Sequence, residues 1–205
     1  DQIKALTAVA HRRRLPVHMD GARFANAVAS LGCAPKDITW RAGIDLLSFG
    51  LTKNGTLAGE ALVFFNRDLA KEFAWQNKQA GQLASKMRFL TAPWVGLLKD
   101  GAWLQHAAHA NKMAQRLRRA LRKIPGVKFL HPTQANAVFV DLPPVLVQAL
   151  HARGWHFYTL YADNDARFMC AWDTTEEDVD TFAADLADLM ANQKSLPPYK
   201  PPRGR

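Results

Sequence analysis

Pro16-Val17-His18-Met19-Asp20-Gly21 and, further along the chain, Asp45-Leu46-Leu47-Ser48-Phe49-Gly50 are the two stretches that decide the fold. Each has the composition of a short buried strand that runs into a glycine turn. A helix predicted over about residues 22–31 separates them, so the pattern favours a βαβ unit with parallel strands. Adjacent parallel strands end on the same edge of a sheet, where ligands bind. We therefore expect the carboxylate of Asp20 and the amine of Lys53 at one ligand-binding edge.

The rest of the first unit, residues 1 to about 92, has the same α/β rhythm. The pattern predicts a helix over residues 2–13, a third strand over 60–65 and a polar, basic, helical segment over 67–92. All three strands have parallel-strand character, because they are apolar on both faces. Three strands are too few to bury such faces. We therefore expect more strands in an N-terminal half before Asp1, so that the sequence is a fragment or a truncated open reading frame.

A second unit follows. A long helix is predicted from about Gly96 to Lys123, and Pro125-Gly126 ends it. Strands are then predicted over 127–130, 135–141, 155–160 and 167–172, with helices over 143–153 and about 176–191. Thr174 and Glu177 are predicted to form the capping box of the last helix. The predicted domains are residues 1–92, a connecting helix over 93–126, a compact α+β domain over 127–191 and a tail over 192–205.

The composition is that of an ordinary globular chain, with 48% hydrophobic and 22% charged residues. We see no apolar run near the ~18 residues that span a bilayer, and no signal peptide. Cys33 and Cys170 match no metal or disulfide spacing, so we expect buried or half-buried thiols in a reducing cytoplasm. The seven histidines show no zinc-ligand spacing.

The net charge of +9 raises the alternative of nucleic-acid binding. The basic residues gather in residues 11–14, 116–123 and 200–205. The first two groups have the pattern of solvated helix faces and helix C-termini, and no recognition motif accompanies them. We therefore expect no nucleic-acid partner, and keep a non-catalytic basic binding module as the alternative from another functional class.

Two motifs carry a family resemblance: His18-Met19-Asp20-Gly21-Ala22-Arg23, and Ser48-Phe49-Gly50-Leu51-Thr52-Lys53-Asn54-Gly55. With them, the chain resembles the aromatic amino acid β-eliminating lyase and threonine aldolase family of fold-type-I pyridoxal-phosphate (PLP) enzymes. The resemblance continues over residues 78–82, 86–88, 136–140, 167–168 and 172–175. It implies an α/β fold: the C-terminal part of an aspartate aminotransferase-like large domain, followed by a small α+β C-terminal domain.

The resemblance also implies a cofactor, PLP, and roles for site residues. Lys53 is the implied Schiff-base lysine, and Asp20 pairs with the pyridine nitrogen so that the ring acts as an electron sink. Arg23 is expected near the 3′ oxygen and the substrate carboxylate, or paired with a neighbouring carboxylate. Arg167 is expected to clamp the substrate carboxylate, with a surface strand-end arginine as the alternative. Thr52 is expected to touch the phosphate.

Other polar residues have plainer interpretations. His18 is expected to be a supporting or core histidine, and Cys33 to pack at a helix end. Lys78, Lys86 and Arg88 could reach the cofactor phosphate of a neighbouring subunit, but a solvated basic face is the favoured interpretation. The family's phosphate cup and ring-stacking histidine are expected before the position of Asp1, and the general base is expected there too.

The function implied by the resemblance is the cleavage of a β-hydroxy-α-amino acid, of the L-threonine or phenylserine type, to glycine and an aldehyde. The alternatives are another fold-type-I lyase, an aminotransferase or an inactive remnant. We also expect a small amino-acid substrate and a homodimer or homotetramer. We expect neither a bound metal nor a membrane partner.

Overall fold

A computed structural model of the chain describes residues 1–199. The chain forms two compact units, residues 1–108 and 109–205, and helix α5 (Ala102–Leu121) runs from the first into the second. Each unit is therefore described by itself. The domain boundaries predicted at residues 92, 126 and 191 stay a prediction. Of the predicted tail, residues 200–205, with their basic side chains, lie outside the described residues.

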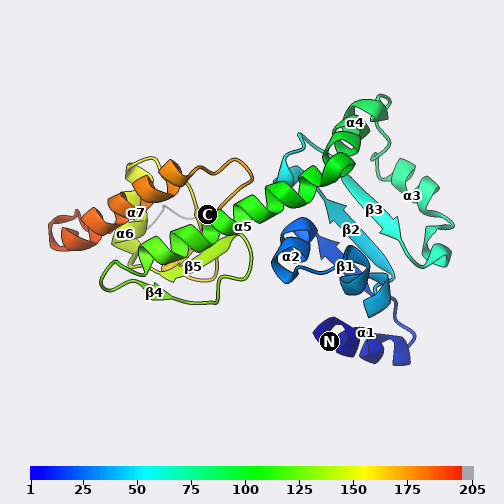
Figure 1. Cartoon of the computed structure of the whole chain (residues 1–205), viewed down its shortest axis with the longest axis horizontal. Coiled ribbons are helices and arrows are strands. Elements are labelled where there is room, and N and C mark those ends of the chain that lie inside the picture. The colour runs from blue at the N-terminus through cyan, green and yellow to red at the C-terminus, as the bar shows by residue number, and fades with distance from the viewer. Residues whose placement is uncertain (200–205) are drawn as a thin grey trace. The chain divides into compact units, whose positions relative to one another are not determined.

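The first unit is built on a three-stranded sheet in the order β1-β2-β3 (Figure 1). Strand β1 (His18–Gly21) pairs in parallel with β2 (Leu46–Gly50), and Asp20 lies opposite Ser48. Helix α2 (Phe24–Leu31) connects them, so the predicted βαβ unit is confirmed. The helix ends at Gly32, whose φ of 61° is the left-handed conformation that glycine adopts without strain.

Strand β3 (Glu60–Phe64) corrects the expectation of parallel character for all three strands. It pairs antiparallel with β2, with Gly50 opposite Glu60. The reason lies in the connection, residues 51–59, which is shorter than the dozen or more residues that a parallel crossover needs. A short loop can return the chain only as an antiparallel neighbour.

The helices of the first unit largely follow the hydrophobic periodicity. They are α1 (Gln2–Arg12), α2, α3 (Phe73–Gln79) and α4 (Met87–Leu98), with short 3-10 turns over residues 35–38, 40–42, 52–54 and 67–70. The small core consists of Phe24, Val28 and Leu47. Phe49 and Trp103 pack against it, with their ring centroids 5.4 Å apart. No residue of α3 or α4 is buried.

The long helix expected over residues 96–123 is interrupted, which corrects the prediction. A turn over Lys99–Gly101 separates α4 from α5. Asp100 and Gly101 have φ values of 58° and 73°, in the left-handed region that cannot continue a helix. The Asp-Gly pair is a turn signal, and Asp tolerates this conformation better than most residues.

The second unit packs helices on a four-stranded antiparallel sheet in the order β4-β5-β7-β6. The strands are β4 (Lys128–Phe129), β5 (Ala137–Asp141), β6 (Tyr158–Thr159) and β7 (Asp165–Met169). The helices are α6 (Pro144–Ala152), α7 (Glu176–Ala191) and the second half of α5. Alternate residues of β5 and β7 are buried in one apolar cluster with Met113, Leu150 and Leu186. The expected small α+β fold is confirmed.

Helix α7 starts at a capping box, one residue later than predicted. Thr175 accepts a hydrogen bond from the Asp178 backbone N–H, and the Asp178 carboxylate accepts one from the Thr175 N–H. The predicted pair was Thr174 and Glu177. The hydroxyl of Thr174 instead accepts a hydrogen bond from the Ala171 N–H at 2.8 Å, which closes the turn before the helix.

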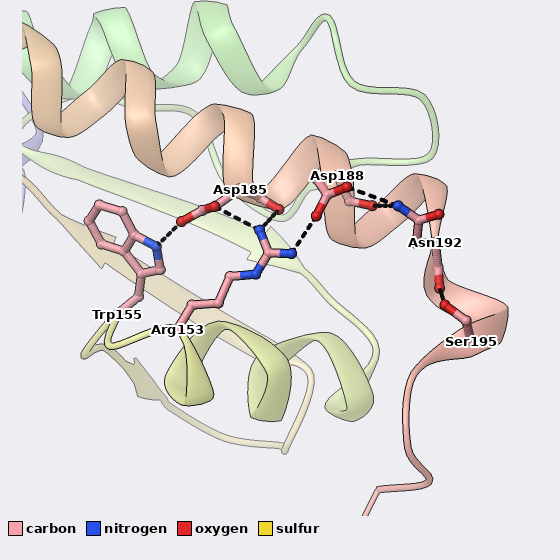
Figure 2. Close-up of polar contacts among 6 residues, drawn as sticks. All are labelled: Arg153, Trp155, Asp185, Asp188, Asn192 and Ser195. Atoms are coloured by element: carbon pink, nitrogen blue, oxygen red, sulfur yellow. Dashed lines mark hydrogen bonds and ion pairs between the residues drawn. The ribbon is translucent and has the colours of Figure 1, made fainter.

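A polar cluster ties the end of α6 to α7 (Figure 2). Arg153 donates to Asp185 at 2.7 Å and also contacts Asp188. The Trp155 indole N–H donates to the other Asp185 oxygen at 2.7 Å. Asp185 thus accepts from two donors that follow α6. Within residues 1–199, no helix is long and apolar enough to cross a membrane.

Candidate active site

The carboxyl ends of β1 and β2 form the edge of the sheet where the sequence pattern predicts the two main candidate residues, Asp20 and Lys53. Asp20 is the third residue of β1, and its side chain is exposed. Its Oδ1 accepts a hydrogen bond from the Ala22 N–H at 2.9 Å, which orients the carboxylate. Lys53 lies in the 3-10 turn Thr52–Asn54, directly after β2, and is also exposed. Because β1 and β2 are parallel, Asp20 near the end of β1 and Lys53 just after β2 lie at the same edge of the sheet.

The carboxylate has polar neighbours on its own face of the sheet. His18 and Asp20 are two residues apart, so both point to one face of β1, and Ser48 lies opposite Asp20 in the register. A ring nitrogen of His18, Nε2, lies 2.7 Å from the Ser48 hydroxyl. His18 is exposed rather than in the core, so of its two predicted roles the supporting one fits its position.

Two glycines of the motifs are required by close approach. A Cβ on Gly21 would lie 2.5 Å from the Ser48 carbonyl oxygen and 2.6 Å from a Leu47 methyl group. A Cβ on Gly50 would contact the Glu60 carboxylate and lie 2.9 Å from the Ala22 Cα. Side chains at these positions would push β1, β2 and the turn after β1 apart. The glycines therefore keep the two strand ends adjacent.

Arg23 and Thr52 lie in the turns at this edge. Arg23 is half-buried at the start of α2, the predicted helix-start position. The Thr52 hydroxyl donates to the Gly59 carbonyl at 3.2 Å and so closes the loop that carries Lys53. Thr52 can donate to a phosphate only by giving up this bond.

Arg167 belongs to the second unit and is not a strand-end residue. It is the central residue of β7 and pairs with Phe139 on one side and Tyr158 on the other. The strand alternation places it on the face opposite to the buried Ala166 and Phe168. Its Nε is buried and, within residues 1–199, has no hydrogen-bond partner. A guanidinium in this state suits an anionic ligand.

The remaining candidates have simple environments. Lys78, Lys86 and Arg88 are exposed, in agreement with a solvated basic face. Cys33 is half-buried and Cys170 is buried, as expected, and both are free thiols. Burial raises the pKa of the Cys170 thiol to about 12, so this thiol stays protonated. Among residues 1–199, no group of three or more His, Cys, Asp or Glu side chains could hold a metal ion.

Sequence reasoning missed two sets of contacts at this edge. The first is the His18–Ser48 pair. The second joins Asn54 to α5, through the Trp103 carbonyl and the His106 ring. The i, i+3 spacing of Trp103 and His106 on a predicted helix is a signal for the second set, because it puts both residues on one face.

The fold and the site together define a class of protein. A parallel strand pair ending in a carboxylate and a lysine, followed by a small antiparallel α+β unit, is part of the fold of fold-type-I PLP enzymes. The chain belongs to the β-eliminating lyase family, since residues 1–143 match the sequence profile described as "Beta-eliminating lyase".

Known proteins place the chain more closely within this family. It is 56% identical over 191 residues to a low specificity L-threonine aldolase of a Pseudomonas species, which covers 93% of this chain and 55% of that enzyme. It is 53% identical over 190 residues to the enzyme of the same name from Pseudomonas aeruginosa, with the same coverage of 93% and 55%. The solved structure of a Leishmania major threonine aldolase matches with a TM-score of 0.82 and 28% identity, over 92% of this chain and 56% of that chain. The chain thus spans about half the length of these relatives.

The residues of this chain fit PLP in their donor chemistry. In the first unit, an exposed carboxylate lies near the end of β1 and an exposed primary amine follows the parallel strand β2. The second unit offers a buried, unsatisfied guanidinium nitrogen on Arg167. A phosphate dianion also needs a cradle of backbone N–H groups, and the sequence has no Gly-rich candidate for one. Each unit, taken by itself, therefore offers donor groups of the chemical kind that a PLP site needs.

Proposed function

We propose that this chain carries the cofactor lysine, the ring-nitrogen carboxylate and the substrate-carboxylate arginine of a PLP-dependent aldolase. The proposed reaction cleaves a β-hydroxy-α-amino acid, of the L-threonine or phenylserine type, to glycine and an aldehyde. The observation that carries the proposal is the parallel register of β1 and β2, which brings the strand ends of Asp20 and Lys53 to one edge. The identity to low specificity L-threonine aldolases favours aldol cleavage over other PLP chemistry.

In this proposal PLP, when bound, supplies an electron sink for the bond that breaks at the substrate Cα. Lys53 supplies the primary amine that holds the cofactor covalently, a role that suits lysine because its pKa falls readily near other cations or away from water. Asp20 holds a proton at the pyridine nitrogen, and the Ala22 N–H keeps its carboxylate oriented. Thr52 and Arg23 are the proposed contacts for the phosphate and the 3′ oxygen.

The substrate is proposed to be held by its carboxylate. Arg167 offers a planar fork that binds a carboxylate through two parallel hydrogen bonds. Its half-buried position and unsatisfied Nε support this role. In the overall reaction the Cα–Cβ bond breaks, the β-hydroxyl loses its proton as Cβ becomes the aldehyde carbon, and Cα gains a proton to become glycine. The β-substituent leaves as part of the aldehyde.

We further propose a homodimer or homotetramer that acts in the cytoplasm. The support for association is the exposure of large apolar side chains on α3 and α4, with Trp75 69% and Phe89 67% exposed. The support for a reducing compartment is the pair of free cysteines.

The test is product analysis with the full-length product of the gene that encodes this chain. The protein is incubated with PLP and either L-threonine or L-phenylserine. We expect glycine together with acetaldehyde or benzaldehyde, and none of the products when the cofactor is removed. A keto acid with ammonia would instead indicate β-elimination, and transfer of the amino group to an added keto acid would indicate transamination. Either result in place of glycine would contradict the proposed aldol cleavage.

A further inference from the structure

The loop that carries Lys53, residues 51–59, is held by its own hydrogen bonds. The Leu51 carbonyl accepts from the Asn54 N–H at 2.8 Å and from the Thr56 N–H at 3.2 Å. Within this loop Lys53 is exposed, whereas the neighbouring Asn54 is buried, with 3% of its surface exposed. The lysine side chain is thus free to reach a ligand, while the backbone beside it is fixed.

Asn54 also ties the loop to the first turns of α5. Its side-chain amide donates to the Trp103 carbonyl at 2.7 Å. Its backbone carbonyl lies 3.0 Å from Nδ1 of His106. A carbonyl only accepts, so His106 must donate from Nδ1, which fixes the tautomer of a neutral ring. Trp103 and His106 share one face of α5, because they are three residues apart.

The helix end that receives these bonds is itself packed in the first unit. The Trp103 ring lies 5.4 Å from the ring of Phe49, in β2, and 6.4 Å from the ring of Phe24, in α2. Asn26 of α2 also donates to the Ala107 carbonyl of α5 at 3.4 Å. The first turns of α5 are therefore fixed to the same strand and helix that define the candidate site.

We propose that Asn54 and His106 are positioning residues for Lys53, a role that rests on the proposed function. Lysine has a long, flexible side chain. The position of the backbone at residue 53 therefore sets the region that the amine of Lys53 can reach. Asparagine suits position 54 because its amide N–H donates to the Trp103 carbonyl. An ionised aspartate has no donor, so its carboxylate oxygen would face the carbonyl oxygen of Trp103 without a hydrogen bond. Small displacements at a reacting centre reduce rates strongly, by about 100-fold for 1 Å.

The test measures how fast and how completely Lys53 reacts with PLP, which does not depend on the reaction that follows. The full-length gene product is stripped of cofactor and mixed with PLP, and the imine absorbance is followed over time at one pH. Borohydride then traps the imine, and peptide mapping gives the fraction on Lys53. The variants are Asn54→Leu, His106→Leu and His106→Asn. The last variant keeps an N–H donor near the position of Nδ1.

The matched control is Thr7→Val. The Thr7 hydroxyl is buried and donates to the Ala42 carbonyl at 2.6 Å, so this variant also removes a buried side-chain hydrogen bond from the first unit. Thr7 lies in α1 and contacts neither the loop nor α5 through this bond. Any effect of general destabilisation should therefore appear in Thr7→Val as well, as a lower thermal midpoint.

We expect Asn54→Leu and His106→Leu to slow imine formation on Lys53 at least about tenfold. His106→Asn should recover most of the rate, and Thr7→Val should leave the rate unchanged. If the two leucine variants lose thermal stability but react like Thr7→Val, the positioning role is wrong. If Asn54→Leu does not fold, the comparison of His106→Leu with His106→Asn decides the question. An imine on Lys53 without glycine and aldehyde as products would overturn only the aldol cleavage. No imine on Lys53 in the unaltered protein would overturn both proposals.

Discussion

Asp20 and Ser48 lie opposite each other in the parallel register of β1 and β2, and the Ser48 hydroxyl lies 2.7 Å from the ring of His18. This register sets the spacing of the candidate site, because Lys53 follows Ser48 after the end of the same strand. The close packing of Gly21 on the Ser48 carbonyl leaves no room for a side chain between the strands. A shift of one residue would move Ser48, and with it the His18 contact, to the other face of the sheet.

The substitution Arg167→Lys should impair the enzyme although it keeps the positive charge. A lysine cannot form the two parallel hydrogen bonds of a guanidinium with a carboxylate, and each charge-assisted bond is worth about 1.5–3 kcal/mol. We expect kcat/KM for L-threonine to fall at least about tenfold. Steady-state kinetics of the full-length gene product measure this. The exposed Arg119→Lys is the control and should be neutral. Unchanged kinetics for Arg167→Lys would remove Arg167 from the site.

Asp45 should stabilise the first unit in a pH-dependent way. Burial raises the pKa of this carboxyl, but hydrogen bonds from the Val17 N–H and His11, both at 2.8 Å, outweigh it and hold the pKa below the ordinary 3.8. A lowered pKa means that the stabilisation is present above the ordinary value and is lost as the pH falls through the lowered one. Asp45→Asn should therefore cost about 1–2 kcal/mol at pH 7 and very little in strong acid.

Urea unfolding of the full-length gene product over a pH series measures the difference between Asp45→Asn and the unaltered protein. Asp68→Asn is the matched control, because Asp68 pairs with Lys71 at 2.8 Å but its side chain is 78% exposed. Exposed ion pairs contribute little, so this variant should be near neutral. If the loss in free energy of unfolding caused by Asp45→Asn grew as the pH fell, the predicted role of Asp45 would be wrong.

Asp185 and Asp188, two aspartates of the cluster in Figure 2, should contribute unequally to the stability of the second unit. Asp185 accepts hydrogen bonds from Trp155 and Arg153. Both bonds hold the pKa of Asp185 below its ordinary value, and the bond from Trp155 has the larger effect. Asp188 accepts from Arg153 and from Asn192, which lies in the same helical end. Asp185→Ala should therefore lower the thermal midpoint more than Asp188→Ala does, by about 2–5 °C. Scanning calorimetry compares the two, and equal losses would show that the Trp155 bond contributes nothing.

The 205-residue chain by itself should bind PLP weakly and associate. Its first unit has a three-stranded sheet within the described residues, and Trp75, Phe89 and Val95 are each more than 65% exposed, at 69%, 67% and 69%. Uncovered apolar surface of this kind favours association. The chain is compared with a chimera. The chimera joins this chain to the part of the Pseudomonas aeruginosa enzyme that lies outside the matched region. Size-exclusion chromatography and a PLP titration should give a defined oligomer and an imine band for the chimera alone. A sharp peak with a strong imine band from the short chain would contradict this.

The sequence predicted those features that depend on neighbouring residues. Hydrophobic periodicity placed α1, α2 and α7 within a few residues, and the paired strands of Asp20 and Ser48 followed from the βαβ pattern. It failed at Asp100, where a two-residue turn signal lies inside a longer helical pattern. The sequence also could not pair Asn54 with His106, since this bond joins residues 52 positions apart and the i, i+3 spacing shows only that Trp103 and His106 share a helix face. Contacts of this kind depend on packing and rotamers, which local patterns do not encode.

The most direct test of the account is to find which lysine holds the cofactor. The full-length gene product is incubated with PLP, reduced with borohydride and digested, and the pyridoxyl group is located by peptide mapping. The account predicts the label on Lys53 alone. It also predicts that Lys53→Ala abolishes both label and turnover while the circular dichroism spectrum is kept, because Lys53 is exposed. A label on Lys78 or Lys86, or full turnover by Lys53→Ala, would contradict the assignment of this edge of the sheet as the active site.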